Sequence, residues 1–334
     1  SLDTLVEHLL HRIVLAPWPN HEQELDTEWI DDNSMPLPLR TRLSSLRVLT
    51  QWCCVQKNAD LVPPVLKLLW ILLGTGEVHR DQHIPLGVRS RLRLFAAQCI
   101  LKLATYDAYA SLILPRMGRL SYALQDECFQ VRMHLLHDLL LYLMRDELPS
   151  EFHAAMFLVA FDPEDEPRVQ VASYSRRLHV LPPVVRHERL ERVIVRFLHL
   201  LAHHPDLNAE SPQTLCSFSR YLEFYLACVA CETNIGVLAR FTACVRTYID
   251  LSVSEPSVEN SRSLYAMAEL AQFLIQRMAD HHGWTIYPVE EEAPCPKDIL
   301  RSTGTIARSV LDGEVWELLQ QQPRRHRDKK TKVA

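Results

Sequence analysis

The feature that most constrains this chain is an apolar stripe of helical period that recurs along its length. One set falls at spacings of three and four residues and runs from Leu92 to Leu103. The same template fits the set from Leu190 to Leu201 and nearly fits the set from Leu264 to Met278. Each set places a broad apolar face on one side of a helix. Sustained alternation with a period of two does not occur, so the sequence predicts helices and no β-sheet.

Residues at the ends of these stripes support the same interpretation. Ser211-Pro212 and Asp162-Pro163 each place an N-cap residue before a proline at the first helical position, and Pro182-Pro183 ends a helix. With boundaries uncertain by about two to four residues, we expect helices at 3–15, 38–57, 61–73, 88–104, 107–113, 115–124, 126–146, 150–161, 164–181, 186–203, 212–231, 234–250, 259–282 and 313–321.

The expected helices form antiparallel pairs at regular intervals. The first helix of each pair begins near 38, 88, 126, 164, 212 and 259. The interval of roughly 40 to 50 residues is typical of HEAT and armadillo repeats. A single bundle or an irregular helical domain is the alternative, but a bundle needs long crossovers, whereas short loops favour a linear stack. The sequence therefore predicts an all-α, HEAT/armadillo-like curved solenoid of about five or six helix pairs.

Departures from the repeat pattern suggest how the chain is organised. We expect one solenoid over 1–322, with a partial repeat and an acidic loop at 1–37, regular repeats at 38–282 and an irregular cap at 283–322. Residues 323–334 are expected to form a disordered basic tail. Because the chain starts at Ser1 directly in a helical pattern, we expect it to be an internal or C-terminal piece of a longer protein.

Charge and cysteine content exclude several classes of function. The chain carries −5, yet the tail from 324 to 332 carries +5, which leaves about −10 on the body. An acidic body does not wrap DNA, because phosphate binding needs a basic surface. Nine cysteines, an odd number, favour reduced thiols in the cytosol or nucleus. No apolar run is long enough to span a membrane.

The basic tail has three open interpretations. It can contact DNA weakly through its charge, act as a nuclear import signal, or be a solvated terminus without function. The residues that would act in the first two cases are Arg324, Arg325, Arg327, Lys329, Lys330 and Lys332.

Motifs for catalysis or metal binding are weak. His199 and His203 have an i, i+4 spacing, but the glutamate of a zinc protease motif is absent, so a polar strip at a helix end explains them better. Cys228 and Cys231 form a CxxC without further ligands, and we expect them to pack in the core of their helix. Phosphate-binding loops and nucleophile motifs are also missing. We therefore predict no catalytic residue, cofactor, metal or small-molecule substrate.

Four segments go beyond generic helical patterning. They read SRLRLFAAQCILKLA at 90–104, DECFQVR at 126–132, LHLLAHHPDL at 198–207 and SLYAMAELAQFLI at 263–275. In this order and spacing they resemble the C-terminal half of the precocious-dissociation-of-sisters family, the HEAT-repeat regulators of cohesin. The resemblance covers roughly residues 38–300. The family's N-terminal repeats, which are associated with Wings-apart-like protein, are missing, so that contact is not assigned here.

The resemblance implies a curved helical solenoid in the nucleus, associated with chromatin. It further implies docking onto the kleisin subunit of the cohesin ring, in support of both maintenance and release of sister-chromatid cohesion. A generic HEAT adaptor with another partner is the rival hypothesis. An enzyme would instead show a deep pocket with clustered ionisable groups.

Residues inside the resembling motifs are the candidates for partner binding. They are Arg91, Asp126, Glu127, Gln130 and Arg132. Two structural alternatives stay open: Arg91 would form an ion pair with a carboxylate of the next repeat, and the acids at 126 and 127 would favour a helix N-terminus.

Trp29 stands among acidic residues. It is expected to belong to a packed loop over the first repeat or, alternatively, to an exposed patch for a basic peptide.

Overall fold

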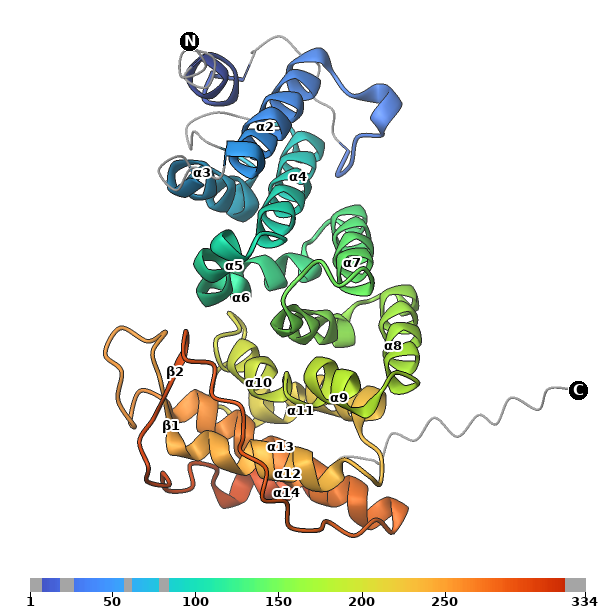
Figure 1. Cartoon of the computed structure of the whole chain (residues 1–334), viewed down its shortest axis with the longest axis vertical. Helices are drawn as coiled ribbons and strands as arrows, with labels where there is room; N and C mark the ends of the chain where they lie inside the picture. Colours follow the sequence, from blue (N-terminus) through green and yellow to red (C-terminus); the bar gives the residue numbers. More distant parts are fainter. Residues whose placement is uncertain (1–7, 19–26, 57–61, 78–83, 322–334) are drawn as a thin grey trace, which may run out of the picture. The chain divides into compact units, whose positions relative to one another are not determined.

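The computed structural model describes residues 8–18, 27–56, 62–77 and 84–321, which are mostly helical (Figure 1). The chain divides into two compact units, residues 1–200 and 201–334. The α-helices of the first unit are α2 (Leu37–Gln56), α3 (Val62–Thr75), α4 (Leu86–Ala104), α5 (Asp107–Ile113), α6 (Met117–Ser121), α7 (Phe129–Met144), α8 (Asp165–His179), α9 (Pro183–Arg186) and most of α10 (Ile194–Ala202).

Consecutive helices of the first unit pack pairwise, as expected of a helical repeat. Helix α4 packs against α2 and α3 and also against α7 (Figure 1). A 3-10 helix at Ser150–Phe161 then packs against both α7 and α8. Helix α4 is buried on most of its surface, with Val88, Ala96, Ala97, Ile100 and Leu103 wholly inaccessible to solvent. The predicted all-α, helical-repeat fold is confirmed.

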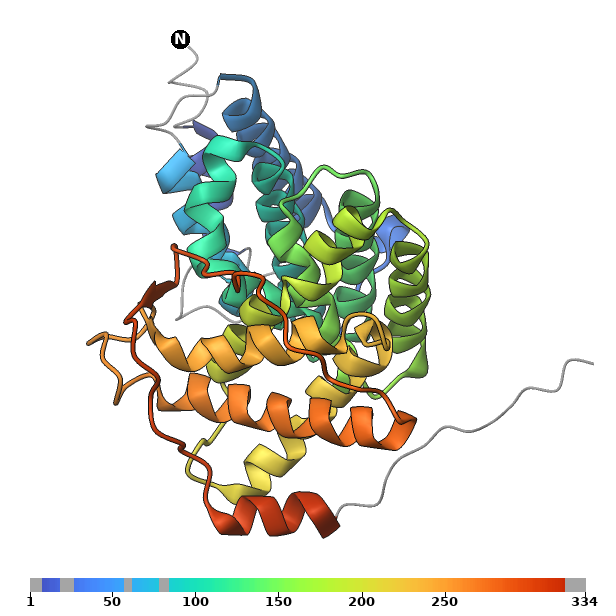
Figure 2. The ribbon, with the colours of Figure 1, turned by 60° about the horizontal axis from the view of Figure 1, so that its bottom comes forward.

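The second unit contains α11 (Pro212–Val229), α12 (Ile235–Cys244), α13 (Arg262–His282) and α14 (Gly313–Gln321). Helix α13 packs against α11 and α12, and α14 packs against α11. The long non-helical segment 283–312 runs across α12 and α13 (Figure 2). Glu269 of α13 holds this segment by accepting hydrogen bonds from the backbone N–H groups of Val310 and Leu311.

The prediction of no sheet was wrong. Strands β1 (Tyr248–Asp250) and β2 (Leu300–Ser302) pair antiparallel. Three residues per strand are too few for alternation to show, and all three residues of β1 are buried. The helix predicted at 234–250 accordingly ends at Cys244, followed by a 3-10 turn at Val245–Thr247.

Three further predicted helices differ in type or continuity. The helix at 115–124 is split into α6 and the 3-10 turns Leu114–Arg116, which contains Pro115, and Tyr122–Gln125. The helix at 186–203 is divided between α9, a π-helical segment at His187–Glu191, and α10. The helix at 150–161 is 3-10, and its residues from 152 to 160 are all buried, so no solvent face imposes the α-helical period.

Two N-terminal segments were also tested. Of the helix expected at 3–15, residues 3–7 lie outside the described residues, and Leu9–Val14 forms a π-helix. Residues Asp32–Ser34 form a 3-10 turn ahead of α2.

Of the two predicted N-caps, only one opens a helix. Helix α8 begins at Asp165, so Asp162-Pro163 does not open that helix. Ser211 does cap α11, where its side chain accepts the N–H of Thr214.

Buried ion pairs link consecutive repeats of the first unit. Arg93 of α4 donates from Nε to the carboxylate of Asp126, just before α7, over 2.6 Å. Arg132 of α7 donates from Nε to the carboxylate of Asp162, just before α8, over 2.9 Å. The four side chains are between 1% and 9% exposed. Each arginine therefore fixes the start of the helix that follows in the next repeat.

The two aspartates share a local geometry. Each carboxylate accepts a hydrogen bond from the backbone N–H two residues later. Six residues after each aspartate, an arginine donates from Nη1 to that aspartate's carbonyl oxygen: Arg132 to Asp126 and Arg168 to Asp162. Arg132 thus binds the backbone at the start of its own repeat and the Asp162 carboxylate at the start of the next repeat. We call Arg93, Asp126, Arg132 and Asp162 the arginine–aspartate ladder.

Breaking the ladder is expected to destabilise the fold. Asp162→Asn leaves the Arg132 guanidinium without its buried charge partner, and we expect the free energy of unfolding to fall by about 3 kcal/mol. Glu164→Gln removes the other carboxylate on the same arginine, which is 46% exposed, and should cost less than about 1 kcal/mol. Urea unfolding followed by circular dichroism measures both variants. Equal losses would contradict the account.

A buried histidine makes stability depend on pH. His153 Nδ1 donates to the carbonyl oxygen of Ser150 over 2.8 Å, and Nε2 accepts from the Tyr174 hydroxyl over 3.0 Å. This pattern requires the neutral imidazole, and burial lowers the pKa of His153 to about 4. Between this value and the ordinary pKa near 6.5, the unfolded chain binds the proton that the folded chain excludes.

This histidine should therefore reduce stability as the pH falls from 7 to 5. Between pH 7 and pH 5, His153 should lower the free energy of unfolding by about 2 kcal/mol. Urea unfolding at the two pH values should therefore show a loss that is larger in wild type than in His153→Gln by this amount. Exposed His137 provides the control, and His137→Gln should behave as wild type. An unchanged pH dependence in His153→Gln would disprove the assignment.

Candidate protein-binding surface

Helix α4 presents arginines to two separate hollows of the first unit. Arg89 and Arg93 lie one turn apart on the same face, whereas Arg91 lies on another. The end of α3 approaches this helix closely at Gly76, whose φ is +71° and where a Cβ would lie 2.5 Å from the carbonyl oxygen of Arg89. Glycine is therefore required there, because any larger residue would displace α3 from the arginines.

The first hollow, of about 370 Å³, lies between α3, α4 and α6. We call it the Arg119 hollow. Arg93 is neutralised there by Asp126 and Glu127. Arg89 donates from Nε to the carbonyl oxygen of Thr75 at the end of α3. The Arg119 hollow is lined by Trp70, Leu73, Gly74, Thr75, Arg89, Arg93, Arg119, Tyr122, Ala123, Asp126 and Glu127.

The second hollow, of about 450 Å³, contains Trp29, and we call it the Trp29 hollow. The Arg91 guanidinium lies 4.4 Å from the centre of the indole ring. His134 of α7 stacks on the same indole with a centroid distance of 5.6 Å. Trp29 is half-buried between them, so the chain before α2 is packed onto α4 and α7. This geometry agrees with the packed-loop interpretation.

The expected partner of Arg91 was wrong. Arg91 forms its ion pair with Asp32, which precedes it in the chain, and not with a carboxylate of the next repeat. Arg93, two residues later, makes the contact to the next repeat. The sequence placed an inter-repeat ion pair on the right helix but on the wrong face.

The other candidate residues divide into buried and accessible groups. Asp126 and Arg132 are committed to the ladder, and their side chains are 8% and 9% exposed. Helix α7 begins at Phe129, so Asp126 lies before the helix and not in its first turn. Glu127 is 75% exposed. Gln130 is half-buried and accepts from the Cys128 thiol. Glu127 is therefore the candidate most available to a partner.

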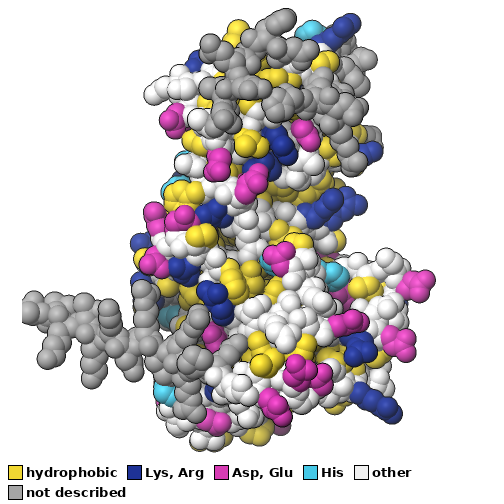
Figure 3. All heavy atoms as spheres, turned by 180° about the vertical axis from the view of Figure 1, so that it is seen from behind, with side chains coloured by type: hydrophobic (Ala, Val, Ile, Leu, Met, Phe, Trp, Pro, Cys, Tyr) yellow, Lys and Arg dark blue, Asp and Glu magenta, His cyan; other side chains and the backbone are white. Residues whose placement is uncertain are grey.

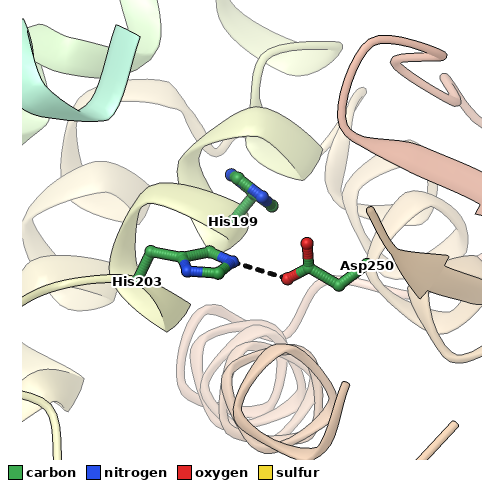
Figure 4. A group of neighbouring side chains, drawn as sticks. All are labelled: His199, His203 and Asp250. Carbon is green, nitrogen blue, oxygen red and sulfur yellow. Dashed lines mark hydrogen bonds and ion pairs between the residues drawn. The ribbon is translucent and has the colours of Figure 1, made fainter. Parts of the chain in front are cut away.

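His203 makes a side-chain contact with strand β1 in the second unit. His203 Nε2 lies 2.6 Å from Asp250 Oδ2, as the dashed line in Figure 4 shows. The other oxygen of Asp250 accepts the backbone N–H of Ser252. These bonds hold the residue after α10 to strand β1. His199 lies one turn earlier on α10 and is buried.

Burial disfavours the thiolate form of two cysteines of the first unit, Cys53 and Cys99. All nine are free. Burial raises the pKa of Cys53 to about 11 and that of Cys99 to about 12, which keeps both thiols protonated. Cys228 and Cys231 are only half-buried, and Cys231 lies beyond the end of α11. The expectation that both pack in the helix core was therefore wrong, because the helix ends before the second cysteine.

The molecular surface carries charges of both signs. On the face drawn in Figure 3, acidic, basic and hydrophobic side chains of the described residues are interspersed. None of the described helices is apolar over a length that could cross a membrane. The six tail cations from Arg324 to Lys332 lie outside the described residues.

Some residues of this surface were missed by the sequence reasoning. Arg93, Arg119 and His134 were not among the candidate residues that the sequence indicated. The recurring spacing of an aspartate followed six residues later by an arginine was the available signal for the ladder. His134 has no comparable signal, because its contact with Trp29 joins residues far apart in the sequence.

Known proteins similar to this chain point to one family. The family model of the sister chromatid cohesion protein PDS5 matches residues 2–301. The sister chromatid cohesion protein pds5 of Schizosaccharomyces pombe is 25% identical over 312 residues, which is 91% of this chain and 25% of that protein. PDS5 of Saccharomyces cerevisiae is 21% identical, over 93% of this chain and 28% of its own length.

An animal relative shows the same likeness over a shorter span. PDS5 homolog A of Danio rerio is 31% identical over 202 residues, which is 56% of this chain and 15% of that protein. The chain spans about a quarter of the length of the two fungal relatives. Since the family model covers most of the sequence, this chain belongs to the PDS5 family of sister chromatid cohesion proteins.

Proposed function

We propose that this chain acts in sister chromatid cohesion as a non-enzymatic scaffold in the nucleus that binds the kleisin subunit of the cohesin ring. Membership of the PDS5 family and the names of its relatives support a role in cohesion. The proposal of a kleisin contact rests on the resemblance of motifs 90–104 and 126–132 to the family.

The observation that carries the site is that these two motifs meet at one surface. Arg93 of the first motif pairs with Asp126 and Glu127 of the second at the rim of the Arg119 hollow. Buried Asp126 and Arg132 hold the backbone, while exposed Glu127 and half-buried Gln130 are available for contact. Arg91 contributes from the Trp29 hollow. Hot spots of such surfaces are few and often charged or aromatic.

A HEAT-repeat adaptor for a different partner is the alternative. It shares the fold and the helical surfaces, so it differs only in the partner that is bound. Binding to kleisin itself therefore discriminates between the two functions.

The direct test is calorimetry of this chain with a purified peptide from the N-terminal half of kleisin at physiological salt. We expect saturable binding that is micromolar or tighter. Glu127→Lys should weaken it about tenfold, because it reverses the accessible charge at the site. The matched control is Glu232→Lys, since Glu232 is also exposed but belongs to the second unit.

The possible outcomes distinguish whether the chain binds kleisin from whether it does so at the surface around Glu127. Binding that is unaffected by Glu127→Lys would retain the function and reject this surface. The absence of binding by the folded chain would reject the kleisin proposal and leave the adaptor. Equal weakening by both variants would show a general electrostatic effect and not a local contact.

The basic tail is proposed to add a weak DNA contact. Deleting residues 323–334 should remove most DNA binding measured by fluorescence anisotropy at low salt, because the body that remains is acidic. The affinity of the intact chain should fall steeply as salt is raised. Equal DNA affinity of the intact and truncated chains would place any DNA contact elsewhere.

A further inference from the structure

An exposed apolar segment connects α8 to α9 in the first unit. It reads Val-Leu-Pro-Pro-Val over residues 180–184, and we call it the knuckle. Val180 is 84% exposed and Val184 is 81% exposed, and the three residues between them are also exposed. Single exposed apolar residues are ordinary in soluble proteins, but a run of five is typical of a contact surface.

The backbone of the knuckle is restricted by its own sequence. Helix α8 ends at His179, and Pro183 opens α9 as its first residue. Two consecutive prolines fix φ at both positions and limit the conformations of the residue before them. A segment held in this way loses little conformational entropy when a partner binds.

The apolar surface extends onto the end of α7. Met144 is 51% exposed, and the Nη1 atom of Arg177 lies 3.8 Å from its sulfur. Arg177 precedes Val180 by three residues, and Val180 keeps helical backbone angles as the C-cap of α8, so these two side chains lie on one side of the helix end. The knuckle, Met144 and Arg177 therefore form a continuous mixed surface.

The charges around this surface are predominantly positive. The nearby carboxylates of Asp146, Glu188 and Glu191 are paired with arginines of the following segment. Among the described residues, no carboxylate pairs with exposed Arg145, Arg176 or Arg177. Glu147 is exposed beside them without a pairing cation among the same residues. This face is thus locally basic on a chain whose net charge is −5.

We propose that the knuckle, with Met144, Arg176 and Arg177, is a second docking surface that binds an acidic segment of a partner protein carrying apolar side chains. The knuckle buries the partner's apolar side chains, and the arginines pair with its carboxylates. A second copy of this chain fits poorly, because a symmetric contact would bring the same arginines together.

The test uses the whole chain and overlapping peptides that cover the subunits of the cohesin ring. The choice of this set rests on the proposed function. Each acidic peptide is paired with a version in which Asp and Glu are replaced by Asn and Gln. The variants are Val180→Asp/Val184→Asp and Arg176→Glu/Arg177→Glu. The control is Val169→Asp on α8, the helix that carries Arg176 and Arg177, because Val169 is also exposed, at 55%.

We expect at least one acidic peptide to bind wild type in fluorescence anisotropy. Its affinity should fall about tenfold or more in both double variants and in the neutral peptide version. Val169→Asp and Glu127→Lys should leave the affinity of this peptide unchanged. Because Glu127 belongs to the proposed kleisin contact, a failure of that contact can be told apart from a failure of the knuckle. Thermal melts monitored by circular dichroism check that each variant is folded.

Three results would overturn the proposal. The first is that no peptide depends on the knuckle for binding. The second is that the neutral versions bind as tightly as the acidic ones. The third is a dimer in analytical ultracentrifugation that Val180→Asp/Val184→Asp dissociates, which would assign the surface to a second copy of the chain.

Discussion

The first unit depends on arginines that are buried together with the carboxylates of the next repeat. Arg93 and Arg132 each connect a helix to the backbone turn that starts the following one. Apolar stripes alone allow neighbouring helices to slide, since hydrophobic contact is not directional. A buried bidentate pair has one satisfactory geometry, and an unpaired member would be costly. The ladder thus fixes the register in which the apolar faces of α4 and α7 and the start of α8 meet.

Within the family-like motif at 126–132, some residues stabilise the fold and others are accessible to a partner. In the stretch from 126 to 132, Asp126 and Arg132 face inward to the ladder, whereas the Glu127 side chain extends into solvent. A motif of this kind can therefore match a family for structural reasons at some positions and for binding at others. The buried members position the exposed one at the rim of the Arg119 hollow, next to the end of α3.

The sequence was sufficient where local patterns determine structure. The stripe from Leu92 to Leu103 predicted α4, and Ser211-Pro212 predicted the start of α11. It was insufficient where long-range contacts decide. The short strands at 248–250 and 300–302 pair across α13, and the Trp29 stack joins the chain before α2 to α7. Neither contact leaves a periodic signal, because each depends on a few residues far apart.

Hydrogen exchange of the whole chain with and without the kleisin peptide would locate the kleisin contact without substituting any residue. The account predicts slower exchange in the backbone at the start of α4, in α6 and in the segment that leads into α7, with α13 unchanged. Binding accompanied by protection only outside these segments would contradict it, since the partner would then contact a surface other than the one that the ladder positions.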